Sequence, residues 1–231
     1  MVRKQYLTDP YRSECEATVV EIRDGRMLLS DTIFFPEGGG QVGDTGLAGE
    51  VPILDTQKFG GKPFVRDDFP EMIMVEGEIA HFFQPGPTAP GVGDELLLRL
   101  DWDRRYKIMQ RHSAAHLAFW YATDARPDLY VKGCRIDDNS ARFDFIADER
   151  LDPDAVAEWE ALSNDAVADD LEITNEPVDN QAEALMWYCS DMRMPCGGTH
   201  VRSTGEIGRI SLRRKRQGNR LERLYITLDE G

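Results

Sequence analysis

Two short segments hold side chains whose types and spacing suit metal binding. His112 and His116 lie four positions apart within a stretch of helical periodicity, so both imidazoles leave the same face of one predicted helix. Much later in the chain, Cys196 and His200 are separated by three residues that include two glycines. Two imidazoles from a helix, with a thiolate and an imidazole from a loop, make four donors of the kind that zinc prefers. Three of the four histidines in the chain fall in these segments, so the sequence predicts a zinc site.

Other interpretations of the same residue types stay open at this stage. A histidine on an apolar helix is often only a core residue, and four protein ligands also fit a closed structural zinc site. Cys189 precedes Cys196 by seven residues and could compete with it as the sulfur ligand. A metallopeptidase is excluded, because that class needs a glutamate directly after the first histidine, where Ser113 stands here. His81 lies in a β-rich stretch and is interpreted as a structural residue at a strand end.

The composition indicates a globular protein without a membrane anchor. The 231 residues suffice for one or two packed domains. No apolar stretch is long enough to cross a bilayer, and the first ten residues are too polar for a signal peptide. We therefore expect a cytoplasmic protein with no membrane partner, whose four cysteines are reduced thiols or metal ligands.

The net charge of −15 is large for this length, and the charge is unevenly distributed. Lysine occurs only six times whereas arginine is frequent, so we expect a salt-adapted, halophilic protein. Such acidity alone argues against a nucleic-acid partner. A dense basic cluster near the C-terminus nevertheless indicates phosphate contact. From that cluster we predict the tRNA-binding residues Arg213, Arg214, Lys215 and Arg216.

The first hundred residues have the pattern of short strands separated by turns. Residues 13–30 show strand character on both sides of Asp24-Gly25, a dipeptide typical of hairpins. Residues 31–46 contain a dense glycine run, in which Gln41 carries both a donor and an acceptor and Thr32 supplies a hydroxyl. Further short strands up to residue 100 predict a small barrel-like domain over residues 1–100.

The remaining residues alternate between helical and strand patterns. A long helix is predicted over residues 104–123, and Asp152 followed by Pro153 predicts the start of a second. A short helix is predicted over residues 181–186. Strands are predicted at residues 130–134, 140–146, 171–178, 208–212 and 221–228. The predicted fold class is therefore α+β, with an N-terminal β-barrel-like domain followed by an α/β two-layer, zinc-containing domain over residues 101–231.

Four segments together resemble a known family. They are residues 35–41 (FPEGGGQ), 112–116 (HSAAH), 196–200 (CGGTH) and 204–208 (TGEIG). They are similar to the editing domain of alanyl-tRNA synthetase, and still more to its freestanding relatives, the AlaX proteins. The resemblance covers most of the chain, from about residue 29 to residue 225, and the glycine run indicates the longer AlaX type. Nothing resembles the synthetase activation core, so the protein is expected to act in trans.

The resemblance implies an aminoacyl-tRNA hydrolase that uses zinc to cleave the ester of mischarged tRNA(Ala). Ser-tRNA(Ala) is the chief expected substrate and Gly-tRNA(Ala) a second candidate. Gln41 is expected to position the substrate, and Thr32 to contact a seryl hydroxyl. The zinc ligands are expected to be His112, His116, Cys196 and His200. Four protein ligands leave open whether zinc activates water or only positions the substrate. The alternative is a zinc-stabilised RNA-binding module without catalysis.

Overall fold

A computed structural model describes residues 2–67, 73–86, 89–218 and 220–229. Over these residues the fold combines many short strands with two α-helices, which confirms the predicted α+β class. Over the described residues, neither helix has both the length and the apolar character needed to cross a membrane.

The chain forms two compact units, and each is built from several stretches of sequence. One comprises Met1–Arg105, Asn175–Trp187 and Met194–Thr199. The other comprises Tyr106–Thr174, Tyr188–Arg193 and His200–Gly231. The division into functional domains that we expected at residue 101 stays a prediction.

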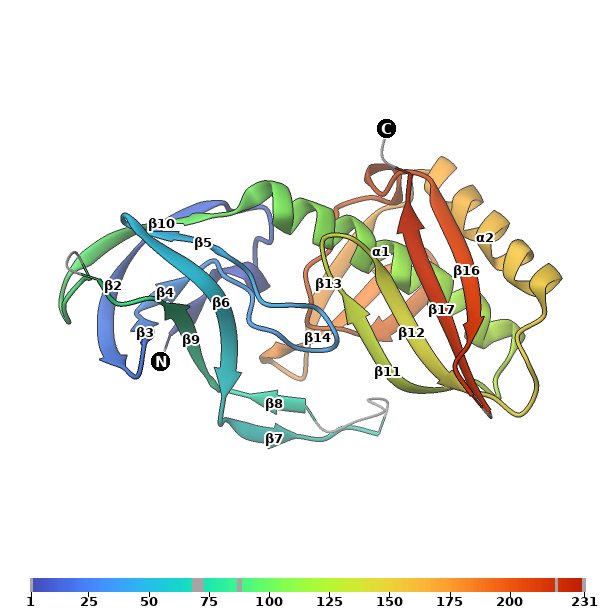
Figure 1. Ribbon diagram of the computed structural model, residues 1–231, viewed down its shortest axis with the longest axis horizontal. Coiled ribbons are helices and arrows are strands. Elements are labelled where there is room, and N and C mark those ends of the chain that lie inside the picture. The colour runs from blue at the N-terminus through green and yellow to red at the C-terminus, as the bar shows by residue number, and fades with distance from the viewer. Residues whose placement is uncertain (1, 68–72, 87–88, 219, 230–231) are drawn as a thin grey trace. The chain divides into compact units, whose positions relative to one another are not determined.

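The first unit contains a closed six-stranded barrel (Figure 1). Its strands, in barrel order, are β10 (Glu95–Leu100), β2 (Glu14–Arg23), β3 (Arg26–Leu29), β9 (Glu78–Phe83), β6 (Val51–Phe59) and β5 (Gly46–Ala48). Asp24 and Gly25 join β2 to β3 with φ angles of 50° and 70°, the left-handed pair that a tight hairpin requires. Alternate side chains of the strands fill the interior, among them Val19, Met27, Ile53 and Leu98, and Phe34 from the segment after β4 joins them.

Shorter elements accompany the barrel. The strand β1 (Arg3–Lys4) pairs in parallel with β4 (Asp31–Thr32), and a 3-10 turn η1 (Gln5–Leu7) follows β1. A separate hairpin pairs β7 (Lys62–Phe64) with β8 (Ile73–Val75).

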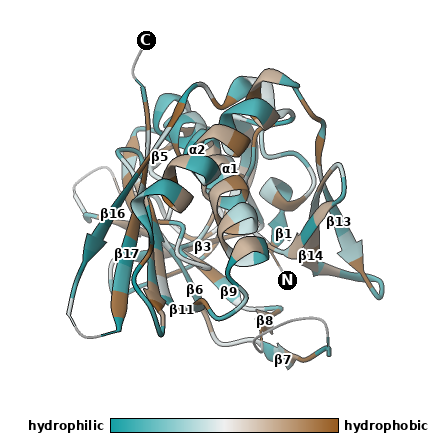
Figure 2. Ribbon diagram, turned by 90° about the vertical axis from the view of Figure 1, so that its right-hand side faces the viewer, coloured by the Kyte–Doolittle hydropathy of each residue, from teal (hydrophilic) through white to brown (hydrophobic). Residues whose placement is uncertain are grey.

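The second unit contains a four-stranded antiparallel sheet. Its strands, in order, are β11 (Tyr130–Ile136), β12 (Ala141–Ile146), β17 (Leu221–Leu228) and β16 (Ile210–Arg216). Figures 1 and 2 show the helices α1 (Trp102–Ala125) and α2 (Pro153–Ala168) on the same side of this sheet. Phe143 and Phe145 of β12 point to that side, with ring centroids 5.4 and 6.5 Å from the ring of Phe119 in α1. The sheet therefore buries one face against helices, as its alternating strands require.

The start of α2 and its contact with the sheet follow from its sequence. Asp152 caps the helix by accepting a hydrogen bond from the backbone N–H of Asp154, as the Asp-Pro pair predicted. Asn164 donates to the carbonyl oxygen of Ile210 and accepts from its N–H, at 2.8 and 2.9 Å. Both backbone groups belong to Ile210 of β16. The two hydrogen bonds therefore hold α2 in register against this edge strand of the sheet.

A three-stranded sheet corrects one prediction. It contains β13 (Ile173–Val178), β14 (Gln181–Cys189) and β15 (Met192–Pro195), so the short helix predicted over residues 181–186 is wrong. Asp179 and Asn180 both have positive φ, 50° and 58°, and make the tight turn that returns the chain as a strand. Pairing with two neighbouring strands outweighs the helix propensity of Ala, Glu, Leu and Met in this segment.

Candidate metal centre and the glycine-rich loop

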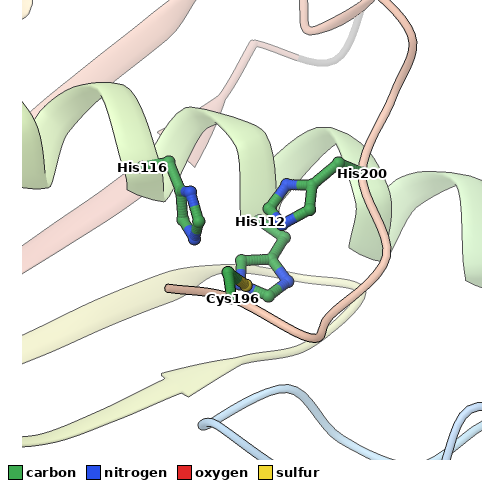
Figure 3. Close-up of side chains that lie close together, drawn as sticks. All are labelled: His112, His116, Cys196 and His200. Atoms are coloured by element: carbon green, nitrogen blue, oxygen red, sulfur yellow. The ribbon is translucent and has the colours of Figure 1, made fainter. Parts of the chain in front are cut away.

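Helix α1 places His112 and His116 one turn apart, and a loop after β15 brings His200 to them. The ring centroids of the two helical histidines are 4.9 Å apart. The ring centroid of His200 lies 4.2 Å from that of His112 and 4.5 Å from that of His116. All three side chains are buried. Together with Cys196, their ligand atoms lie within 4.8 Å of one another (Figure 3). The structure thus brings together all four predicted ligands.

Ser113 holds the His200 ring. Its Oγ lies 3.1 Å from Nδ1 of His200, and the backbone N–H of Val201 donates to the same oxygen at 3.3 Å. A partner on one ring nitrogen fixes the imidazole and assigns coordination to the other nitrogen. Ser113 occupies the position at which a metallopeptidase would need its glutamate. Here this residue orients the His200 ring instead. This role of Ser113 was not predicted from the sequence, although its place beside His112 was the available signal.

The three histidines are held in the neutral form that a metal requires. Burial lowers the pKa of His112 to about 3. Burial, followed by the neighbouring histidines, lowers the pKa of His116 and of His200 well below the usual value. Neutral imidazoles keep the lone pair that binds a metal ion. The set of three nitrogens and one sulfur, without a carboxylate, fits zinc and does not fit calcium or magnesium.

The loop around Cys196 distinguishes the two candidate cysteines. The N–H of Cys196 donates to the carbonyl oxygen of Leu185 in β14 at 3.0 Å, and its sulfur accepts from the N–H of Gly198 at 3.4 Å. Cys189 is buried, and burial raises the pKa of its thiol to about 11. In the described part of the chain, the group of potential ligands includes Cys196 and not Cys189.

The glycine run forms a tight turn that presents Gln41. The backbones of Gly38 and Gln41 exchange two hydrogen bonds of 3.0 Å, and Gly39 and Gly40 between them have φ angles of 58° and 86°. Glycine adopts such left-handed conformations without the steric cost that a Cβ atom adds. Gln41 itself is fully buried.

The Gln41 amide is anchored to Thr199, the residue before His200. Its Nε2 donates to Thr199 Oγ1 at 2.9 Å, and its Oε1 accepts from the Thr199 N–H at 3.0 Å. The Gln41 amide thus pairs with both the backbone N–H and the hydroxyl of Thr199. Thr199 belongs to the loop that carries the candidate ligands Cys196 and His200. Thr199 was not singled out from the sequence, since nothing local indicates a partner 158 positions away.

A buried ion pair fixes the ends of the glycine-rich segment. Asp44 accepts a hydrogen bond from the N–H of Phe35 at 2.6 Å and is paired with Arg105. The same guanidinium donates to the carbonyl oxygens of Ile33 and Pro10 at 2.8 and 2.9 Å. Both charged side chains are almost completely buried, so each depends on the other for its stability. The turn before Gln41 is therefore held rigidly.

Thr32 already has two hydrogen-bond partners inside the barrel unit. Its hydroxyl accepts from the N–H of Phe34 at 3.0 Å and lies 2.7 Å from Nε2 of His81. Nδ1 of His81 lies 3.0 Å from the carbonyl oxygen of Met27 and must carry the proton. Burial lowers the pKa of His81 to about 4, so the ring is neutral and Nε2 accepts from Thr32. His81 lies within β9 and not at its end, and it is structural as predicted.

The four predicted tRNA-binding residues do not share one face of the sheet. Arg213 and Lys215 lie opposite Tyr225 and Arg223 of β17 and are exposed. Arg214 points to the helix side, where it pairs with the buried Glu222 at 3.5 Å. The Arg216 Nε donates to the carbonyl oxygen of Gly218 in the following turn.

Comparison with known proteins gives consistent results. A family model described as the threonyl and alanyl tRNA synthetase second additional domain matches residues 191–225. The chain is 32% identical over 241 residues to the alanyl-tRNA editing protein AlaX-M of Pyrococcus horikoshii, with 99% of each chain covered. It is 28% identical to the AlaX-M protein of Methanosarcina mazei, covering 99% of this chain and 97% of that one. It is also 29% identical to the alanine–tRNA ligase of Pyrobaculum arsenaticum, of which it spans only 25%.

Proposed function

The chain belongs to the family of AlaX-M alanyl-tRNA editing proteins, and we propose that it hydrolyses mischarged tRNA(Ala) in trans, in the cytoplasm. The chief substrate in this proposal is the seryl ester, with the glycyl ester as a second one. The observation that carries the proposal is the group of His112, His116, Cys196 and His200, in a chain that matches an AlaX-M protein over 99% of both sequences.

We propose that these four side chains hold zinc. When bound, zinc supplies Lewis acidity and a fixed anchor for the aminoacyl end of the tRNA. Ser113 orients His200 for this task through the contact on Nδ1. The burial of the three imidazoles keeps them unprotonated, in the form that can bind a metal ion.

Gln41 is proposed as a positioning residue. Its two hydrogen bonds to Thr199 fix the loop that carries Cys196 and His200. The Asp44–Arg105 pair holds the segment from which Gln41 projects. This chain of contacts supports a role in keeping the predicted site in one geometry, which catalysis requires to within a fraction of an ångström.

Thr32 remains our candidate for recognising a seryl hydroxyl, but only as a hydrogen-bond acceptor. Because its proton is donated to His81, Thr32 Oγ1 can accept a further hydrogen bond but cannot donate one. A seryl hydroxyl would therefore have to donate to it. Alanine lacks that donor, so a site built around this contact would spare Ala-tRNA(Ala).

Hydrolysis of seryl-, glycyl- and alanyl-tRNA(Ala) by the zinc-loaded protein tests the proposal. We expect the seryl ester to be cleaved and the alanyl ester to be spared. The Thr32→Val substitution keeps the shape and removes the acceptor, so it should narrow the seryl-to-alanyl ratio of kcat/KM by roughly 5–100-fold. Binding of tRNA without cleavage of any ester would instead support the alternative, an RNA-binding module without catalysis.

Salt adaptation stays a prediction drawn from the net charge of −15. Like charges on an acidic surface repel one another most strongly in dilute buffer, where the screening length is long. We expect the midpoint of thermal unfolding to rise from dilute buffer to molar potassium chloride. An unchanged or falling midpoint in the same titration would contradict the halophilic interpretation and leave the editing function untouched.

A further inference from the structure

The outer face of the four-stranded sheet, on the side away from α1 and α2, carries a row of cationic and aromatic side chains. The strand register places Arg135 opposite Arg142, Arg142 opposite Tyr225, and Tyr225 opposite Arg213. Directly opposed residues point to the same face of a sheet. Their neighbours Phe143, Leu224 and Ile226 are buried on the other face. One row thus crosses all four strands as Arg, Arg, Tyr, Arg.

A second row runs parallel to the first. It places Lys215 opposite Arg223, and Arg223 opposite Asp144. Asp144 is the one carboxylate in these two rows, and it forms a bidentate ion pair with Arg223. In a chain whose net charge is −15, this sheet face is locally positive.

The tyrosine ring is held in place by the cations around it. The guanidinium carbon of Arg213 lies 4.7 Å from the ring centroid of Tyr225, and that of Arg223 lies 5.7 Å from it. Arg223 also donates to the Tyr225 hydroxyl at 3.4 Å. The Tyr225 ring remains partly exposed beside these cation–π contacts.

Three of the cations have no carboxylate partner among the described residues: Arg142, Arg213 and Lys215. The Nε of Arg142 is moreover buried without a hydrogen-bond acceptor in the described part of the chain. Folding normally pairs such donors, and a buried one left unpaired costs free energy. A phosphate that arrives from outside would meet the exposed cations Arg213 and Lys215 at this place.

We propose that this outer face, defined by Arg142, Arg213, Lys215, Arg223 and Tyr225, binds an unpaired segment of tRNA. The proposal rests on the proposed function and specifies the surface that holds its substrate. The unpartnered cations contact phosphates, and a base stacks on the Tyr225 ring between them. Unpaired RNA is the fitting partner, because its bases are available to stack whereas those of a duplex are not. Arg214, which points to the helix side, is not part of this surface.

The experiment measures the affinity of the zinc-loaded full chain for deacylated tRNA by fluorescence anisotropy, at several potassium chloride concentrations. Arg213→Ala and Arg142→Ala should each weaken binding and reduce the slope of log Kd against log salt by about 1. Tyr225→Ala should weaken binding roughly 10-fold, and Tyr225→Phe should restore it, since stacking needs the ring and not the hydroxyl. Lys62→Ala is the matched control, because it removes one exposed cation from the separate β7–β8 hairpin.

An Arg213→Ala variant that binds tRNA with the same affinity and salt slope as Lys62→Ala would overturn the proposal. If Arg213→Ala and Lys62→Ala weaken tRNA binding to the same extent, the proposal is also contradicted, because binding would then respond only to the net charge of the protein. A thermal-unfolding midpoint within a few degrees of the parent shows that each variant is folded. Since deacylated tRNA has no ester, this test is independent of catalysis. A chain that binds through this face but cleaves no ester contradicts only the proposed function.

Discussion

Cys196→Ala is expected to lose bound zinc and ester hydrolysis together. The sulfur belongs to a group whose ligand atoms all lie within 4.8 Å of one another, and as a thiolate it is the one anionic donor in that group. Loss of a direct ligand should cost more zinc affinity than the 10–100-fold that loss of a residue supporting a ligand typically costs. Zinc content after dialysis against a chelator, and kcat/KM for the seryl ester, are the two measurements.

Matched substitutions make this expectation specific. Cys189→Ala removes another thiol and should keep both zinc and activity, because Cys189 lies outside the group. Ser113→Ala should weaken zinc binding about 10–100-fold through the His200 ring that it orients. Ser163→Ala is its control, since Ser163 is an equally buried serine whose hydroxyl donates only within α2. Zinc retained by the Cys196 variant and lost by the Cys189 variant would show that the wrong cysteine had been chosen.

The predictable parts of the fold were those with local signals. The hairpin at Asp24-Gly25, the cap at Asp152 and the long helix that carries His112 each depend on residues within a few positions of one another. The same holds for the candidate ligands, because spacing within a helix and within a short loop fixes which donors can converge. Segment 181–186 was misassigned because its helix propensity is local, whereas the pairing that makes it β14 is not.

The parts that could not be predicted are those that join distant residues. Gln41 meets Thr199 across 158 positions, and Asp44 meets Arg105 across 61. No periodicity or spacing encodes such contacts, since they exist only once the barrel unit has formed. The same limit applies to the basic cluster near the C-terminus, where alternation along β16 puts Arg213 and Arg214 on opposite faces. A charge cluster in sequence is therefore a poor guide to a charged surface.

Gln41→Ala is expected to lower kcat/KM for the seryl ester by about 10²-fold, the scale of losing one well-placed polar contact near a reacting centre. The substitution removes both hydrogen bonds to Thr199 and leaves a buried N–H without its acceptor. We expect most of the loss in kcat, because the affected loop carries candidate ligands and not the bulk of the tRNA contacts. Single-turnover hydrolysis at saturating enzyme separates this effect from binding.

A double-mutant cycle with Thr199→Val decides how Gln41 acts. That substitution removes the Oγ1 acceptor and keeps the backbone N–H that Gln41 Oε1 accepts. If Gln41 works by anchoring the loop, Thr199→Val should lose part of the same activity, and the two losses should not add in the double variant. If the Gln41 amide instead acts on the substrate alone, Thr199→Val should leave the rate unchanged and the effects should be additive. Additive losses would therefore contradict the anchoring role, whereas shared losses with unchanged zinc content would establish Gln41 as a positioning residue.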